Sequence, residues 1–168
     1  MRRLKMVMLG IVGLVIGICT PVWVLGSLER DWSIGPSSVG DVVVGRPVPL
    51  FVLGMGPELF SSYYGDQIPY LGLRLEQVSI SLEYFIIVRG IIPEPELRTA
   101  EGTGVGSTLS ELEQAHGSLE LFDIPEPFRC AVTTPTLPDV YFEFTDCDAA
   151  RAGDVVVRVN IWRRIGDF

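Results

Sequence analysis

Two stretches of the chain share one pattern of glycines. Gly45 and Gly56 recur as Gly106 and Gly117 at a constant offset, and the valine before the first glycine of each pair recurs as well. A Leu-Phe pair and then strand-like sequence follow the second glycine in both stretches. Self-similarity at a fixed offset is typical of repeated structural units. We predict a tandem duplication, and the alternative is a chance recurrence in a chain with 18 glycines.

The second stretch contains the signals of a helix. Thr108 and Glu111 have the spacing of a capping box, in which each residue satisfies a backbone donor of the other. Leu112 and His116 follow at helical spacing, and Gly117 suits a helix end. We therefore expect a short helix with His116 on its packed side. In the first stretch, Pro47 and Pro49 permit only a short helix.

Apolar residues alternate with other residues towards the end of the chain, which predicts half-buried strands. A third strand is expected in the segment FRCAVT, and short turns would make the three an antiparallel meander. The residues expected to face the helices are Val140, Phe142 and Phe144 in one strand, and Val155, Val157, Val159 and Ile161 in the next.

These patterns predict an α+β fold with short helices packed on an antiparallel sheet, in two tandem helix-plus-meander units. We expect three parts, in which 1–26 is an export signal or membrane anchor, 27–38 a linker, and 39–168 the α+β domain. The predicted repeats within the domain are 39–98 and 99–165.

The amino terminus has the pattern of an export segment. It begins with the basic stretch MRRLK. The run from Met6 to Gly26 then carries no charge, and it is long enough to cross a hydrocarbon core of about 30 Å as a helix. Two alternatives stay open for this segment, which are cleavage after Gly26 and retention as an uncleaved anchor. Cys19 suggests a lipoprotein, but Ile18 stands where such a signal needs a small residue. We expect the rest of the chain in the cell envelope, on the periplasmic or extracellular side, secreted or membrane-anchored.

Charge and cysteine usage agree with that location. All 21 acidic residues lie beyond Gly26, whereas three of the 13 basic residues precede it, so the exported part is strongly acidic. Such a surface repels nucleic acid. Cys130 and Cys147 form an even pair, which in an oxidising compartment predicts a disulfide that staples the first hairpin of the meander. Closing this loop would contribute roughly 3 kcal/mol.

One segment of the second stretch resembles a motif of uncharacterised exported bacterial proteins. TAEGTGVGSTLSELEQAHG is similar to a turn of the form T-x-x-G-x-x-V-G-S-T that opens a short helix ending in Gly, and SIGPSSVGDVVVGRPVPLFVLGMGP resembles a shorter form of it. Units of this kind are similar to the β-lactamase-inhibitor-protein fold and to BamE (SmpA)-like outer-membrane lipoproteins. The resemblance implies helices on one face of a sheet and says more of fold than of function.

Several catalytic or metal chemistries have weak support. Gly102, Gly104 and Gly106 suggest a phosphate loop, but no Lys follows them. The chain has 1 histidine, His116, so a triad would depend on it, and we expect it to be packed instead. Acidic residues near the end of the chain lack the spacing of a calcium loop, and we expect a solvated turn. They are Asp146, Asp148 and Asp154.

The remaining candidate is a protein-binding patch on the open face of the sheet, because aromatic and Arg side chains dominate binding hot spots. The predicted members are Tyr141, Glu143, Arg158 and Trp162. The alternative is an ordinary amphipathic sheet. We expect a non-enzymatic binding or scaffolding protein of the envelope with a protein or peptide partner, no nucleic acid, no metal and no cofactor. Membrane contact would run through residues 1–26 if they are uncleaved. The alternative is an extracellular hydrolase that uses carboxylates, which would need a deep pocket holding two acids.

Overall fold

The computed structural model describes residues 30–64, 68–84, 86–124 and 129–162. The predicted export segment, with Cys19, lies outside these residues. The chain divides into two compact units, Met1–Arg30 with Pro49–Pro57 and Asp31–Val48 with Glu58–Phe168. Across the described ranges, no helix has both the length and the apolar character needed to span a membrane.

The first unit contains the short helix α2 (Leu50–Gly54). Pro49 precedes it with a φ of −64°, which proline fixes and which suits a helix start. The Arg30 guanidinium lies 3.6 Å from the centre of the Phe51 ring, a cation–π contact. The sequence prediction of a short helix after the two prolines is confirmed.

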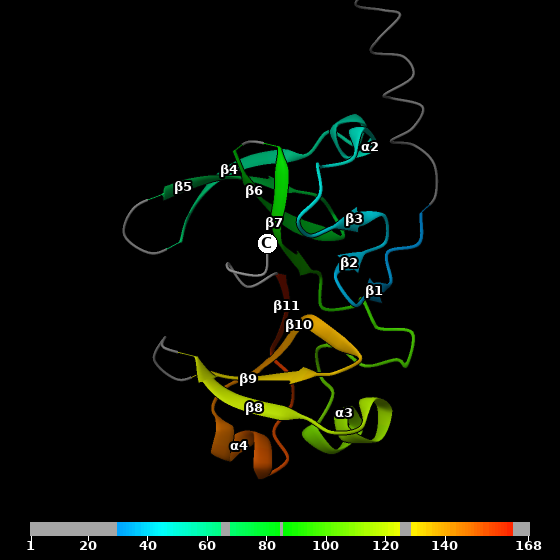
Figure 1. Cartoon of the computed structure of the whole chain (residues 1–168), viewed down its shortest axis with the longest axis vertical. Coiled ribbons are helices and arrows are strands. Elements are labelled where there is room, and N and C mark those ends of the chain that lie inside the picture. Colours follow the sequence, from blue (N-terminus) through cyan, green and yellow to red (C-terminus); the bar gives the residue numbers. More distant parts are fainter. Residues whose placement is uncertain (1–29, 65–67, 85, 125–128, 163–168) are drawn as a thin grey trace, which may run out of the picture. The chain divides into compact units, whose positions relative to one another are not determined.

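The second unit is built on an eight-stranded sheet with the order β4-β5-β6-β7-β11-β10-β9-β8 (Figure 1). All neighbouring strands pair antiparallel. A three-stranded sheet of β1 (Ile34–Gly35), β2 (Ser38–Val39) and β3 (Val42–Val43) accompanies it, and β2 lies against β7. The strands of the large sheet are β4 (Glu58–Tyr64), β5 (Ile68–Arg74), β6 (Val78–Glu83), β7 (Ile87–Pro93), β8 (Glu120–Ile124), β9 (Arg129–Thr134), β10 (Leu137–Phe144) and β11 (Arg158–Trp162). The predicted α+β class with short helices and an antiparallel sheet is confirmed.

One face of the large sheet carries the core, and we call it the core face. An apolar row crosses five adjacent strands through directly paired residues, each at most 1 % exposed. The row consists of Leu73, Ile80, Ile91, Ile161 and Val140. Because side chains alternate along a strand, the residues between them lie on the opposite face. We call that opposite face the polar face.

Helix α3 (Leu109–His116) packs on the core face. Leu112 is fully buried, and the His116 ring stacks on Phe142 with a centroid separation of 6.0 Å. The predicted capping box is present, since Thr108 accepts from the Glu111 backbone at 3.3 Å and donates its own N–H to the Glu111 carboxylate at 2.7 Å. The predicted helix start and end are confirmed, and Gly117 ends the helix at a φ of +82°.

Helix α4 (Cys147–Arg151) follows β10 and lies against β8, β9 and β10. Cys147 is bonded to Cys130 of β9, with the two Cα atoms 4.9 Å apart, so the predicted disulfide is present. It differs from the prediction in one respect, because it joins β9 to the first residue of a helix and does not link the two strands of a hairpin. Cys130 shares the core face with its near neighbour Val132, so both helices of this unit cover the same side.

The alternation predicted before β11 is wrong for Val155 and Val157, which are 39 % and 50 % exposed. The strand begins only at Arg158. Val156, which is 1 % exposed, instead pairs its backbone with Gly106 and Ser107 in the turn before α3. Because of this backbone pairing, the buried residue before β11 is Val156, and not Val155 or Val157. Val159 and Ile161 face the core as predicted.

The sheet order places two four-stranded meanders side by side, β4 to β7 and β8 to β11, joined between β7 and β11. In the chain, α2 precedes the first meander and α3 precedes the second. The glycines of the sequence pattern at 45, 56, 106 and 117 all adopt positive φ. The repeat boundaries at 39–98 and 99–165 remain a prediction.

Candidate functional site

The four residues of the predicted patch all lie on the polar face. Tyr141 of β10 lies opposite Asn160 of β11, and Glu143 lies opposite Arg158, so these side chains project to one side of the sheet. Trp162 comes two residues after Asn160 in β11 and therefore lies on the same side. Both helices of this unit, α3 and α4, lie on the other side in the part of the chain that the structure describes. The prediction of an open surface is nevertheless wrong for Tyr141 and Glu143, which are only 7 % and 4 % exposed.

Large neighbouring side chains bury these two residues. The Phe122 ring meets Tyr141 edge to face at 5.9 Å between centroids. Glu143 accepts a hydrogen bond from Arg158 Nε at 2.7 Å, and Arg158 Nη2 lies 2.7 Å from the same oxygen. Asn160 donates to the other oxygen of Glu143. Glu143 is therefore the buried anchor of a hydrogen-bonded cluster, and Arg158 is the member that reaches solvent, with 38 % of its side chain exposed.

Trp162 lies beside a row of small residues. It pairs with Gly90, which pairs with Ser81, which pairs with Gly72. A Cβ added at Gly90 would lie 3.5 Å from the Trp162 Cβ. A hollow of about 80 Å³ opens here, bounded by Trp162 and by the half-exposed Ile92 of β7. Arg89 and Arg158 also line this hollow.

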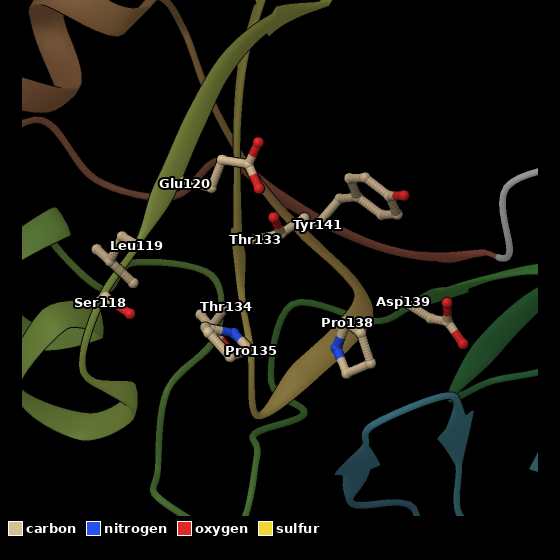
Figure 2. A pocket seen from close by; sticks show the side chains of 9 residues that line it. All are labelled: Ser118, Leu119, Glu120, Thr133, Thr134, Pro135, Pro138, Asp139 and Tyr141. Atoms are coloured by element: carbon tan, nitrogen blue, oxygen red, sulfur yellow. The ribbon is translucent and has the colours of Figure 1, made fainter.

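A larger pocket of about 460 Å³ lies on β8, β9 and β10 (Figure 2). Figure 2 shows side chains from these three strands, which include Pro138 of β10. It also shows Ser118 and Leu119 just before β8, and Pro135 in the turn between β9 and β10. It is lined by Ser118, Leu119, Glu120, Thr133, Thr134, Pro135, Pro138, Asp139 and Tyr141. Its two carboxylates come from Glu120 and Asp139, and Asp139 accepts a hydrogen bond of 2.6 Å from the Ser37 hydroxyl.

His116 is buried, as predicted, with 1 % of its side chain exposed. Its Nε2 shares a hydrogen bond of 2.7 Å with the Thr103 hydroxyl, and its Nδ1 lies 3.4 Å from the Thr136 hydroxyl. Thr99 and Thr134 extend this chain of hydroxyls in both directions. The carboxylate of Glu101 lies 4.0 Å from Nδ1. The histidine therefore links the loop before α3 to the turn after β9.

The other sequence candidates have structural roles. Asp146 caps α4 by accepting from the Ala149 backbone at 2.6 Å, and Asp148 pairs with Arg151 at 3.0 Å. Asp154 continues the chain after this helix. Gly102 and Gly106 take positive φ in the turns before α3. No group of three or more metal-ligating side chains occurs among the residues described.

Sequence reasoning missed several residues of the polar face. Asn160 could have been found, because it stands between Arg158 and Trp162 with the same alternation. Gly90, Ile92 and Glu120 reach the face only through strand pairing, for which the sequence carries no local signal.

No protein-family model matches the chain, and no curated protein matches its sequence. A solved structure does match, that of the uncharacterised protein YfeY from Escherichia coli. The two share 12 % sequence identity with a TM-score of 0.55, and the match covers 79 % of this chain and 99 % of YfeY. At this identity the likeness shows a common fold and carries no function.

Proposed function

We propose that this chain is a non-enzymatic binding protein of the cell envelope that takes a peptide segment of a partner on the polar face of its sheet. The disulfide supports a location outside the cytoplasm, where such bonds persist. The basic start and the uncharged run at residues 1–26 support export, with the segment either cleaved or kept as an anchor.

The single observation that carries the proposal is the arrangement around Trp162. The half-buried Trp162 lines a small hollow together with Arg89 and Arg158. Trp and Arg are the residues most enriched in binding hot spots, and they act where a partner side chain fills a pocket. The hollow of about 80 Å³ has room for one small apolar side chain of a peptide.

Glu143 preorganises this surface. Because Arg158 is held at 2.7 Å by a buried carboxylate, its guanidinium loses less rotamer freedom when a partner binds. The peptide would therefore meet a fixed donor beside the Trp162 ring. Carbonyl and carboxylate groups of a peptide are the acceptors that suit such a donor.

A peptide library displayed on phage and selected against the full-length chain tests the proposal. For a selected peptide, Trp162→Ala should lower affinity by roughly 2 kcal/mol or more. Ile86→Ala is the matched control, because it also removes an exposed apolar side chain (57 % exposed) but from outside this face. Unchanged binding by the folded Trp162→Ala variant would contradict the proposal, as would an equal loss in the control.

The alternative function is a hydrolase that uses carboxylates, and one observation favours it. Glu120 and Asp139 line the same pocket of about 460 Å³. Loss of a hydrolytic activity in both Glu120→Gln and Asp139→Asn would support this alternative.

A further inference from the structure

The turn between β6 and β7 carries an exposed aromatic residue in an unfavourable backbone conformation. The Ile86 N–H donates to the Glu83 carbonyl at 3.2 Å, which closes a tight turn with Tyr84 in its second position. Among the described residues, Tyr84 alone combines a positive φ, of 51°, with a side chain other than that of glycine. Gly, Asn and Asp suit this conformation, whereas a bulky residue is rare there. Local backbone preference therefore does not account for a tyrosine at this position.

Packing does not account for this tyrosine either. Tyr84 is 81 % exposed, and Ile86, two residues further on, is 57 % exposed. These two large side chains at the end of one hairpin add little to the core, and their exposure to water is unfavourable. Apolar groups that gather on a surface mark contact with a partner or a membrane. We call Tyr84, Ile86 and the neighbouring Arg46 the hairpin tip.

Arg46 makes the hairpin tip basic. Its carbonyl accepts from the Val88 N–H at 2.8 Å, so Arg46 lies beside the start of β7, and the residue is exposed. The acidic Glu83 at the end of β6 pairs with Arg89 at 3.4 Å, so these two charges offset each other. The chain as a whole carries a formal charge of −8. An exposed arginine beside exposed apolar groups suits a surface with negative headgroups over an apolar interior, which is a lipid membrane.

The sequence before the described residues favours a membrane over a protein as the partner of the tip. The uncharged run from Met6 to Gly26 is predicted to be an export signal or a membrane anchor. Three residues separate Gly26 from Arg30, the first described residue, so a retained anchor would hold Arg30 within about 14 Å of the membrane surface. A short tether gives a weak second contact a high effective concentration at that surface.

We propose that the hairpin tip docks on a lipid membrane, with Tyr84 and Ile86 among the headgroups and Arg46 at the lipid phosphates. Tyrosine is enriched at this depth because its ring is apolar and its hydroxyl is polar. The contact fixes the orientation of the sheet at the membrane, which a tether at one point leaves free. The inference does not depend on peptide binding, because the tip lies in a turn at the end of two strands and Trp162 lies on the face of the sheet.

Fluorescence quenching in lipid nanodiscs tests the proposal on the full-length chain. The discs contain phosphatidylethanolamine, phosphatidylglycerol and a lipid that carries a nitroxide near its headgroup. A bimane label is attached to Ile86→Cys in a Cys19→Ala background, in which Cys130 and Cys147 are protected by their disulfide. The nitroxide lipid should quench this label several-fold more than the same label on Val157→Cys.

Val157 is the matched control for position 86. It is an apolar residue of similar exposure, 50 %, and it precedes β11. Because β11 runs antiparallel to β7 with Ile161 opposite Ile91, Val157 lies beyond the end of β7 that is far from the turn. Equal quenching at the two positions, or no quenching at position 86, would overturn the proposal and leave a protein as the partner of the tip.

Two substitutions test the named side chains. Tyr84→Asn should remove most of the quenching at position 86 and leave the urea midpoint of unfolding unchanged or higher, since Asn suits a positive φ. Arg46→Gln should lower the quenching in discs with phosphatidylglycerol and have no effect in discs of phosphatidylcholine alone. Arg151→Gln removes the same charge from α4 and should change neither result.

Unchanged quenching in Tyr84→Asn would overturn the proposal. Equal losses from Arg46→Gln and Arg151→Gln would overturn the role of Arg46. The outcome is separate from that of the proposed function, because the Trp162→Ala variant can lose a peptide while the label at position 86 is quenched as before.

Discussion

Tyr141 of β10 and Asn160 of β11 lie directly opposite each other in the sheet, and each lines a different pocket. Paired residues in antiparallel strands have Cα atoms about 4.5–5.5 Å apart. The pocket on β8, β9 and β10 and the Trp162 hollow are therefore neighbours on one face. Glu143, which accepts from Asn160 and Arg158, lies beside this pair.

The ion pair of Glu143 and Arg158 makes a measurable contribution to stability. Arg158→Met should destabilise the fold by about 2 kcal/mol, because it leaves a buried carboxylate with fewer partners, and partial exposure of Arg158 reduces the effect below that of a fully buried pair. Urea unfolding measures the change. The double variant Arg158→Met with Glu143→Gln should recover part of the loss, since the stranded charge is gone. Additive losses in the double variant would contradict this account.

The disulfide stabilises the second meander. Replacing both Cys130 and Cys147 by Ala should lower the free energy of unfolding by about 2–4 kcal/mol, because the loop they close gains freedom in the unfolded chain. Peptide mapping by mass spectrometry without reductant should recover the linked pair from the native protein. Full alkylation of both thiols in native, unreduced protein would contradict the bond. Cys19→Ala provides the control, as it lies outside the closed loop.

His116 is expected to act as a structural link and not as a general base. His116→Phe keeps an aromatic ring against Phe142 but leaves the hydroxyls of Thr103 and Thr136 without their nitrogen partners. The expected loss is about 1–3 kcal/mol in the free energy of unfolding. His116→Gln, which can still bond a hydroxyl, should lose less. Equal losses in the two variants would show that ring packing alone matters.

The capping box makes stability depend on pH. The Thr108 backbone N–H, and then its hydroxyl, hold the pKa of Glu111 below its ordinary value of 4.5. Since the folded pKa is the lower one, the ionised carboxylate stabilises the fold above the unfolded pKa, and this contribution is lost as the pH falls through the folded pKa. When the pH is lowered from 7 to about 3, the Glu111→Gln variant should therefore lose less of its free energy of unfolding than the wild type does. Urea unfolding at each pH measures the difference.

Glu113→Gln is the matched control, because it removes one charge from the exposed side of the same helix. If both substitutions change the pH dependence equally, the capping box is not its source.

Local sequence determined much of the secondary structure. The capping box, the proline-limited α2 and the alternation in β10 each depend on neighbouring residues, so their signals are visible in the printed sequence. The disulfide was predictable for a different reason, since only two cysteines lie beyond residue 26, which leaves one pairing. The resemblance to the β-lactamase-inhibitor-protein and BamE folds, the repeat boundaries and the envelope location stay predictions.

Only the tertiary structure decided which of these residues form a site. Tyr141 and Glu143 alternate with buried residues, which predicts that they are exposed. Phe122 from β8, two strands away, and Arg158 and Asn160 from the adjacent β11 enclose them instead. The hollow at Trp162 likewise needs Gly90 from a strand far away in the chain. Alternation within a strand specifies only the face on which a side chain lies. Its exposure depends on the size of its cross-strand neighbours, which the register between strands selects.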